Sequence, residues 1–294
     1  MTDKHPCSVA RTYQRILRSA IWRRNLGYNR ASIGREMSIG PQGRSADYSQ
    51  GPEASPIDHM RLRMRVPRND QEIAWALQLH HCRPQLLWCL SLLRAQYPTS
   101  RVVLIVDGDD EEYGDIAAAY HCDLVRGVHL MARSTCHLYV NRLLQALLAG
   151  NEHYLFKIDP DTRVWRRFSL LPAFSSMFGT LETTTERRRD PISVPPNVQG
   201  GCIGITRDAA VDILESGVIN EQSCVTDYAQ TWARCTDMLA CAARGRCCDD
   251  FILSWAAHAV GVPLVGLEEI RSYWRRTVEN DDLRYAVTHP HKQS

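Results

Sequence analysis

The chain has 294 residues, 44% hydrophobic and 23% charged, a composition typical of globular proteins. This length allows one large α/β domain or two smaller ones with a full hydrophobic core. The longest uncharged stretch, Phe251–Leu267, falls short of the ~20 apolar residues of a membrane-spanning helix, and the N-terminus lacks the apolar region of a signal peptide. We therefore expect a cytoplasmic protein.

The 11 cysteines include no CxxC pair and show no regular spacing, which favours reduced thiols. His80-His81-Cys82 has no second cluster at the spacing that a zinc site needs.

Residues 1–58 differ in charge and composition from the rest of the chain. Met1–Arg68 holds 13 Lys+Arg against 5 Asp+Glu, whereas the remainder holds 22 against 28. Gly34–Pro56 is rich in Gly, Ser and Pro, as linkers are. We expect a disordered leader before a domain at residues 59–294. The alternative is a basic arm that contacts nucleic acid, or anionic lipid at the inner face of the membrane; no specific nucleic acid is expected.

The ordered part is predicted to begin near Met60. Arg61–Val66 alternates charged and apolar residues, as strands do. A helical stretch is predicted from Asp70, with a break at Pro84 and a continuation over Leu86–Ala95.

Two buried strands are predicted next along the chain. Val102–Val106 is a continuous apolar run that ends at Asp107, and Tyr154–Ile158 is a short apolar and aromatic run, interrupted by Lys157, after the predicted helix His137–Leu148. Continuous apolar runs suit strands that are covered on both faces. Strands that alternate with helices predict an α/β fold with a mostly parallel central sheet flanked by helices.

Asp159-Pro160-Asp161 follows the second of these strands directly. In an extended segment the two carboxylates point the same way. Ligands of open α/β sheets bind beyond the carboxyl ends of the strands, where Asp107 also stands. Carboxylate oxygens suit Mn²⁺ or Mg²⁺. The alternative is a strand-ending turn with solvated acids.

Three further positions in the second half could carry chemistry. Gly200-Gly201 at the entry to a strand indicates either close approach to a ligand or a tight turn. Asp249-Asp250 precedes a helix, where a carboxylate most often only caps the helix; the alternative is that one acid caps while the other serves as a general base. His289 is either a frayed-tail histidine or a metal ligand.

Five segments in this order resemble the GT-A glycosyltransferases: VVLIVDGDD, HYLFKIDPDTRVW, VQGGCIGITRDAA, CCDDFILSWAAHAVGVPLV and THPHK. The resemblance implies a Rossmann-like GT-A fold in which Asp159 and Asp161 bind the metal and the nucleotide diphosphate. It also places Asp107, Pro67 and Arg68 at the nucleotide.

The same resemblance implies roles for the later segments. Gly200 and Gly201 would line the donor and acceptor site, Asp250 would be the base of an inverting enzyme, and His289 would complete the metal site. Position 249 has Asp where this family usually has Glu. The implied activity is transfer of a sugar from a nucleotide-sugar donor, UDP-linked by preference, to a hydroxyl of a glycan or other acceptor.

Two other functions stay open from the residues. A nucleotidyltransferase uses a related α/β fold, but it usually has a glycine-rich phosphate loop where this chain reads VPRND. A non-catalytic binding protein with a basic arm is the second. A dinucleotide-dependent dehydrogenase is disfavoured because GxGxxG follows no early strand.

Overall fold

A computed structural model describes residues 64–80, 82–106, 113–125, 135–184, 193–221, 249–272 and 283–289. The chain divides into two units, Met1–Arg63 and Met64–Ser294, and all described residues belong to the second. The predicted leader and Asp107 lie outside the described residues.

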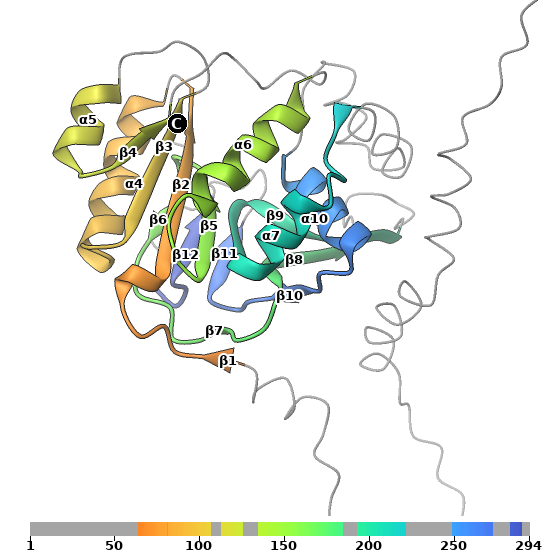
Figure 1. Cartoon of the computed structure of the whole chain (residues 1–294). Coiled ribbons are helices and arrows are strands. Elements are labelled where there is room, and N and C mark those ends of the chain that lie inside the picture. The colour runs from red at the N-terminus through yellow and green to blue at the C-terminus, as the bar shows by residue number, and fades with distance from the viewer. Residues whose placement is uncertain are drawn as a thin grey trace, which may run out of the picture. The chain divides into compact units, whose positions relative to one another are not determined.

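Four parallel strands form one half of a seven-stranded sheet (Figure 1). They are β5 (Tyr154–Ile158), β2 (Ile73–Leu79), β3 (Arg101–Val106) and β4 (Asp123–Val125), in that spatial order. Every residue of β5 is buried, as expected for a strand covered on both faces. The strand predicted at Tyr154–Ile158 is confirmed.

The first strand of this sheet corrects the sequence prediction. A helical stretch was expected from Asp70, but only Asp70–Glu72 forms a single 3₁₀ turn before β2 begins. Ala and Leu in the run IAWALQL favour helices by propensity. In a central strand, however, packing on both faces outweighs propensity. Pro84 does not break a helix: it lies in the first turn of α4 (Arg83–Gln96), where proline is tolerated.

The other half of the sheet makes it mixed. β9 (Ser193–Thr206) lies between β5 and β8 (Met177–Thr184) and runs antiparallel to both. β10 (Leu264–Gly266) pairs with β8 in parallel and forms the edge. The predicted α/β class is confirmed, with an antiparallel strand directly beside β5.

Three helices pack together on one face of the sheet: α6 (Cys136–Leu148), α7 (Arg207–Glu215) and α10 (Asp249–Val260). In Figure 1 α6 crosses in front of the parallel strands, and α4 lies on the other side of the sheet. The short α5 (Gly114–Ala119) packs beside β4. Among the described residues, the helices are all too short or too polar to cross a bilayer.

The face that carries α4 has an aromatic core. Trp75 stacks on Phe156 at 4.6 Å between ring centroids, and Phe156 stacks on Phe168 at 5.0 Å. Stacked rings of this kind add to the free energy gained by burying their area. This core fixes β2 against β5, the strand that carries the acidic pair.

Two small sheets complete the fold. β11 (Ile270–Ser272), β12 (Val287–His289) and β6 (Arg163–Val164) form one, with β12 antiparallel to β6. β1 (Met64–Arg65) pairs with β7 (Leu171–Pro172) in the other. Because β6 begins two residues after Asp161, β12 brings the end of the described chain next to the acidic pair.

Candidate metal centre

The turn that carries the two acids is tied to β9. The backbone N–H of Asp159 donates to the carbonyl of Gly201 at 3.2 Å, and the Thr162 hydroxyl donates to the same carbonyl at 2.7 Å. The Thr162 N–H donates back to the Asp159 carbonyl at 3.0 Å. These bonds fix the backbone between the acids, so their side chains leave from a rigid turn at the carboxyl end of β5.

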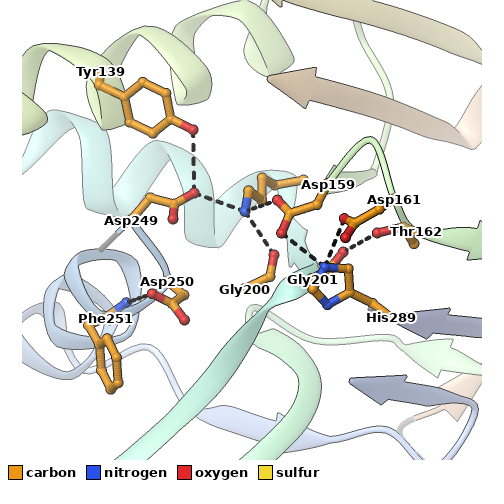
Figure 2. A network of polar contacts seen from close by, with 11 residues as sticks. Tyr139, Asp159, Asp161, Thr162, Gly200, Gly201, Asp249, Asp250, Phe251 and His289 are labelled. Carbon is orange, nitrogen blue, oxygen red and sulfur yellow. Dashed lines mark hydrogen bonds and ion pairs between the residues drawn. The ribbon is translucent and has the colours of Figure 1, made fainter. Parts of the chain in front are cut away.

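His289 lies between the two acids (Figure 2). Its Nε2 is 3.0 Å from Oδ1 of Asp161 and 3.3 Å from Oδ2 of Asp159. One ligand atom from each of the three residues lies within 4.8 Å of the others. The side chains of Asp159, Asp161 and His289 are 32%, 22% and 13% exposed, so an ion could enter from solvent.

The donor set of this triad fits a divalent cation. Two carboxylates are hard ligands that suit Mg²⁺ and Mn²⁺, and an imidazole beside them shifts the preference toward Mn²⁺. The solvated-turn alternative does not account for the imidazole, which comes from a strand 128 residues later in the chain. The structure therefore brings together the three residues that the sequence proposed as metal ligands.

Gly200 and Gly201 leave space for the side chains of Asp250 and His289. A Cβ atom at Gly201 would lie 2.1 Å from Nδ1 of His289, a distance that real atoms do not reach. At Gly200 a Cβ would lie 3.1 Å from Oδ2 of Asp250. β9 can thus pass between His289 and Asp250 because it has no side chains there.

Lys157 lies under the acidic pair and is buried. Its Nζ is 2.6 Å from Oδ1 of Asp159 and 3.0 Å from Oδ2 of Asp249, and it donates to the carbonyl of Gly200 at 2.8 Å. Burial acts to lower the pKa of Lys157, but the charges of Asp159 and Asp249 outweigh burial and raise this pKa. Lys157 therefore carries a positive charge at neutral pH.

Asp249 and Asp250 both lie in the first turn of α10. Asp249 binds Lys157 and accepts from the Tyr139 hydroxyl at 3.4 Å. Asp250 accepts a first-turn backbone N–H, that of Phe251, at 2.9 Å. The observed roles of the two acids differ from a division into one cap and one free base. Asp249 forms an ion pair with Lys157, and Asp250, the candidate base, itself accepts a hydrogen bond from the helix backbone.

The carboxyl of Asp250 has an unusual acidity. Its burial and the negative charge of the adjacent Asp249 raise the pKa of Asp250 to about 7. A carboxylate with a pKa near the working pH can accept a proton and still be ionised in a large fraction of molecules. Asp250 therefore has the acidity of a general base at neutral pH.

Pro67 and Arg68 do not reach the candidate metal centre. The backbone N–H of Arg68 donates to the side chain of Glu72 at 2.9 Å, immediately before β2 begins. Because β2 and β5 are parallel, this is the edge of the sheet opposite to Asp159. Their placement at the nucleotide followed from an assumed first strand at Arg61–Val66. The first strand of the main sheet is β2, and its carboxyl end meets His80 instead.

The partners of Lys157 could not be identified from the sequence. The sequence gives no sign that Asp249 and Tyr139 belong to one network with Lys157. These contacts depend on where α6 and α10 pack on the sheet, which a motif does not record.

The chain gives no match to any known family model, and no curated protein matches it significantly.

Proposed function

We propose that this chain is a metal-dependent glycosyltransferase of the GT-A type, which transfers a sugar from a nucleotide-sugar donor, UDP-linked by preference, to an acceptor hydroxyl. The observation that carries the proposal is the placement of the triad Asp159, Asp161 and His289 at the carboxyl end of β5, with Asp250 across Gly200. A cation-binding triad and a separate carboxyl base are the two parts that sugar transfer from a diphosphate requires.

Asp159, Asp161 and His289 would hold Mn²⁺ or Mg²⁺, which when bound neutralises the diphosphate leaving group as a Lewis acid. The imidazole and the two carboxylates converge from β12 and from the turn after β5, so the protein positions the donor diphosphate at the edge of the sheet. Ligands of open α/β sheets bind at this edge.

Asp250 would take the proton of the acceptor hydroxyl as that oxygen attacks the sugar carbon. The bond from this carbon to the diphosphate breaks in the same step, so the configuration at the carbon is inverted. The raised pKa of Asp250, about 7, supports this role because the carboxylate can gain a proton near neutral pH.

The test is a thermal-shift screen of the full-length chain with nucleotide sugars, with and without Mn²⁺. A ligand that binds the folded state at 100 times its Kd raises the free energy of unfolding by about 2.7 kcal/mol. We expect stabilisation by a UDP-sugar that requires Mn²⁺ and is abolished by EDTA.

Asp161→Ala should lose this stabilisation. The control is Asp212→Ala, which removes an exposed carboxylate from α7 and should respond as the wild type does. Absence of Mn²⁺-dependent stabilisation by every nucleotide sugar would overturn the proposal. Stabilisation by nucleoside triphosphates alone would indicate a nucleotidyltransferase instead.

A further inference from the structure

The ammonium of Lys157 contacts three different structural elements at once. Its acceptors are Asp159 after β5, the carbonyl of Gly200 in β9 and Asp249 in α10, all within 3.0 Å of Nζ (Figure 2). A lysine ammonium has three N–H donors, so these acceptors use all of them. Lys157 therefore has no donor left for a phosphate of a ligand and acts inside the protein.

The choice of lysine at this position is itself informative. The chain has 35 Lys+Arg, of which only three are lysines: Lys4, Lys157 and Lys292. An arginine presents a rigid planar fork of donors, whereas an ammonium is compact and can donate in three directions. Acceptors that converge from three elements on one buried point fit an ammonium and do not fit a guanidinium.

Lys157 connects the two parts of the site. Its contact with Oδ1 of Asp159 leaves Oδ2 of that residue toward His289, at 3.3 Å. Its contact with Asp249 fixes the first turn of α10, in which Asp250 follows directly. We propose that Lys157 is a positioning residue that holds the metal triad and the general base in one fixed arrangement. This inference rests on the proposed metal-dependent function.

Loss of the ammonium should disturb the triad. Asp159 and Asp249 would then lie near each other without the positive charge of Lys157 between them. Two carboxylates at so short a distance either share a proton or move apart. Movement apart would turn Asp159 away from His289, and a shared proton would lower the negative charge that Asp159 offers to a cation. Simple electrostatics predicts the opposite effect on the ion, because removal of a neighbouring positive charge strengthens the attraction of a cation. The sign of the change in metal affinity therefore separates positioning from bulk charge.

The experiment is a titration of the full-length chain with Mn²⁺, followed by electron paramagnetic resonance of the free ion, for the wild type, Lys157→Met and Lys157→Arg. Residues that orient metal ligands typically contribute 10–100-fold to metal affinity, so we expect Lys157→Met to raise the Kd for Mn²⁺ by about tenfold or more. Lys157→Arg keeps the charge and so protects the fold, and it should lose affinity as well because its fork cannot meet three converging acceptors.

Arg101→Met is the matched control. Arg101 is another largely buried cation, which donates to Glu152 at 2.8 Å and to the carbonyl of Ala146 at the end of α6. It lies at the start of β3, at the edge of the sheet away from the triad. Arg101→Met should lower the melting temperature. It should leave the Kd for Mn²⁺ within about twofold of wild type, because distant sites without shared partners affect each other by no more than this.

Unchanged or tighter binding of Mn²⁺ by Lys157→Met would overturn the positioning role, and so would wild-type affinity in Lys157→Arg. Both results require a wild-type chain that binds Mn²⁺. A wild type that binds none would remove the metal site, and the proposed function and this inference would fall together.

Discussion

The imidazole of His289 occupies the space that a side chain at position 201 would need. A Cβ atom on Gly201 would lie 2.1 Å from Nδ1 and 2.2 Å from Cγ of the histidine. β9 and β12 therefore meet at a contact between backbone and imidazole, and the position of His289, the third residue of the candidate metal centre, depends on a missing side chain in another strand.

Gly201→Ala should displace His289 and weaken Mn²⁺ binding by about tenfold or more, the usual cost of disturbing a ligand's support. A Mn²⁺ titration of the purified variant measures this. Gly200→Ala is the matched control, since its Cβ would contact Asp250 at 3.1 Å and leave His289 in place. It should keep the affinity for Mn²⁺, and equal affinities of both variants would contradict the role of Gly201.

Asp250 should make stability depend on pH. The folded chain keeps a proton on Asp250 up to about pH 7, where its raised pKa lies, whereas an unfolded chain releases it near pH 4. Because the folded state binds more protons in this interval, the contribution to stability is complete below about pH 4 and is lost as the pH rises to about 7.

Asp250→Asn should remove this dependence and be more stable than the wild type above pH 7, as measured by urea unfolding at a series of pH values. Asp208→Asn, at an exposed acid in the first turn of α7, is the control and should follow the wild-type curve. Under the proposed function Asp250→Asn also loses sugar transfer while it keeps donor binding. Wild-type turnover in this variant would rule out Asp250 as the base.

Trp75→Ala should destabilise the fold by about 3–5 kcal/mol, the usual cost of removing a buried aromatic side chain. Trp75 is fully buried and stacks on Phe156, whose strand carries the acidic pair. Trp88→Ala makes the same substitution at a side chain that is 48% exposed and lies over Arg163, and it should cost about 1 kcal/mol. Chemical denaturation of both variants tests the difference, and similar losses would refute the assignment of the core.

His289→Asn should make the stability of the chain insensitive to Mn²⁺. In the wild type, Mn²⁺ at 100 times its Kd should raise the free energy of unfolding by about 2.7 kcal/mol, and EDTA should reverse this. His258→Asn is the control, because His258 donates from Nε2 to the carbonyl of Pro196 and lies outside the triad. A His289→Asn chain that Mn²⁺ stabilises like the wild type would exclude the histidine as a ligand.

The strand β5 and the candidate metal ligands Asp159 and Asp161 could be singled out from the sequence because both have local signals. A buried run that ends at two acids is visible in HYLFKIDPDTRVW, and strand alternation relates Asp159 to Asp161. The helix predicted from Asp70, where the structure has the strand β2, was wrong because Ala and Leu suit a helix as well as a fully buried strand. That error also misplaced Pro67 and Arg68, since the end of the first strand was assigned too early.

The contacts between distant segments could not be predicted in the same way. The need for glycine at position 201 arises from a histidine 88 residues later, and the partners of Lys157 come from the turn after β5, from β9 and from α10. Such contacts depend on the packing of helices on the sheet, which periodicity in a single sequence does not encode.

The short strand β12 has a consequence for dynamics. It has three residues and joins β6 and β11, and it alone supplies the imidazole of the triad. Short strands outside the main sheet open by local unfolding more readily than the core does. An opening of β12 would remove His289 from Asp159 and Asp161 while the main sheet stays folded. A bound ion would then slow hydrogen exchange at the amides of β12 more than at those of β2, so exchange rates in this strand would report occupancy of the site.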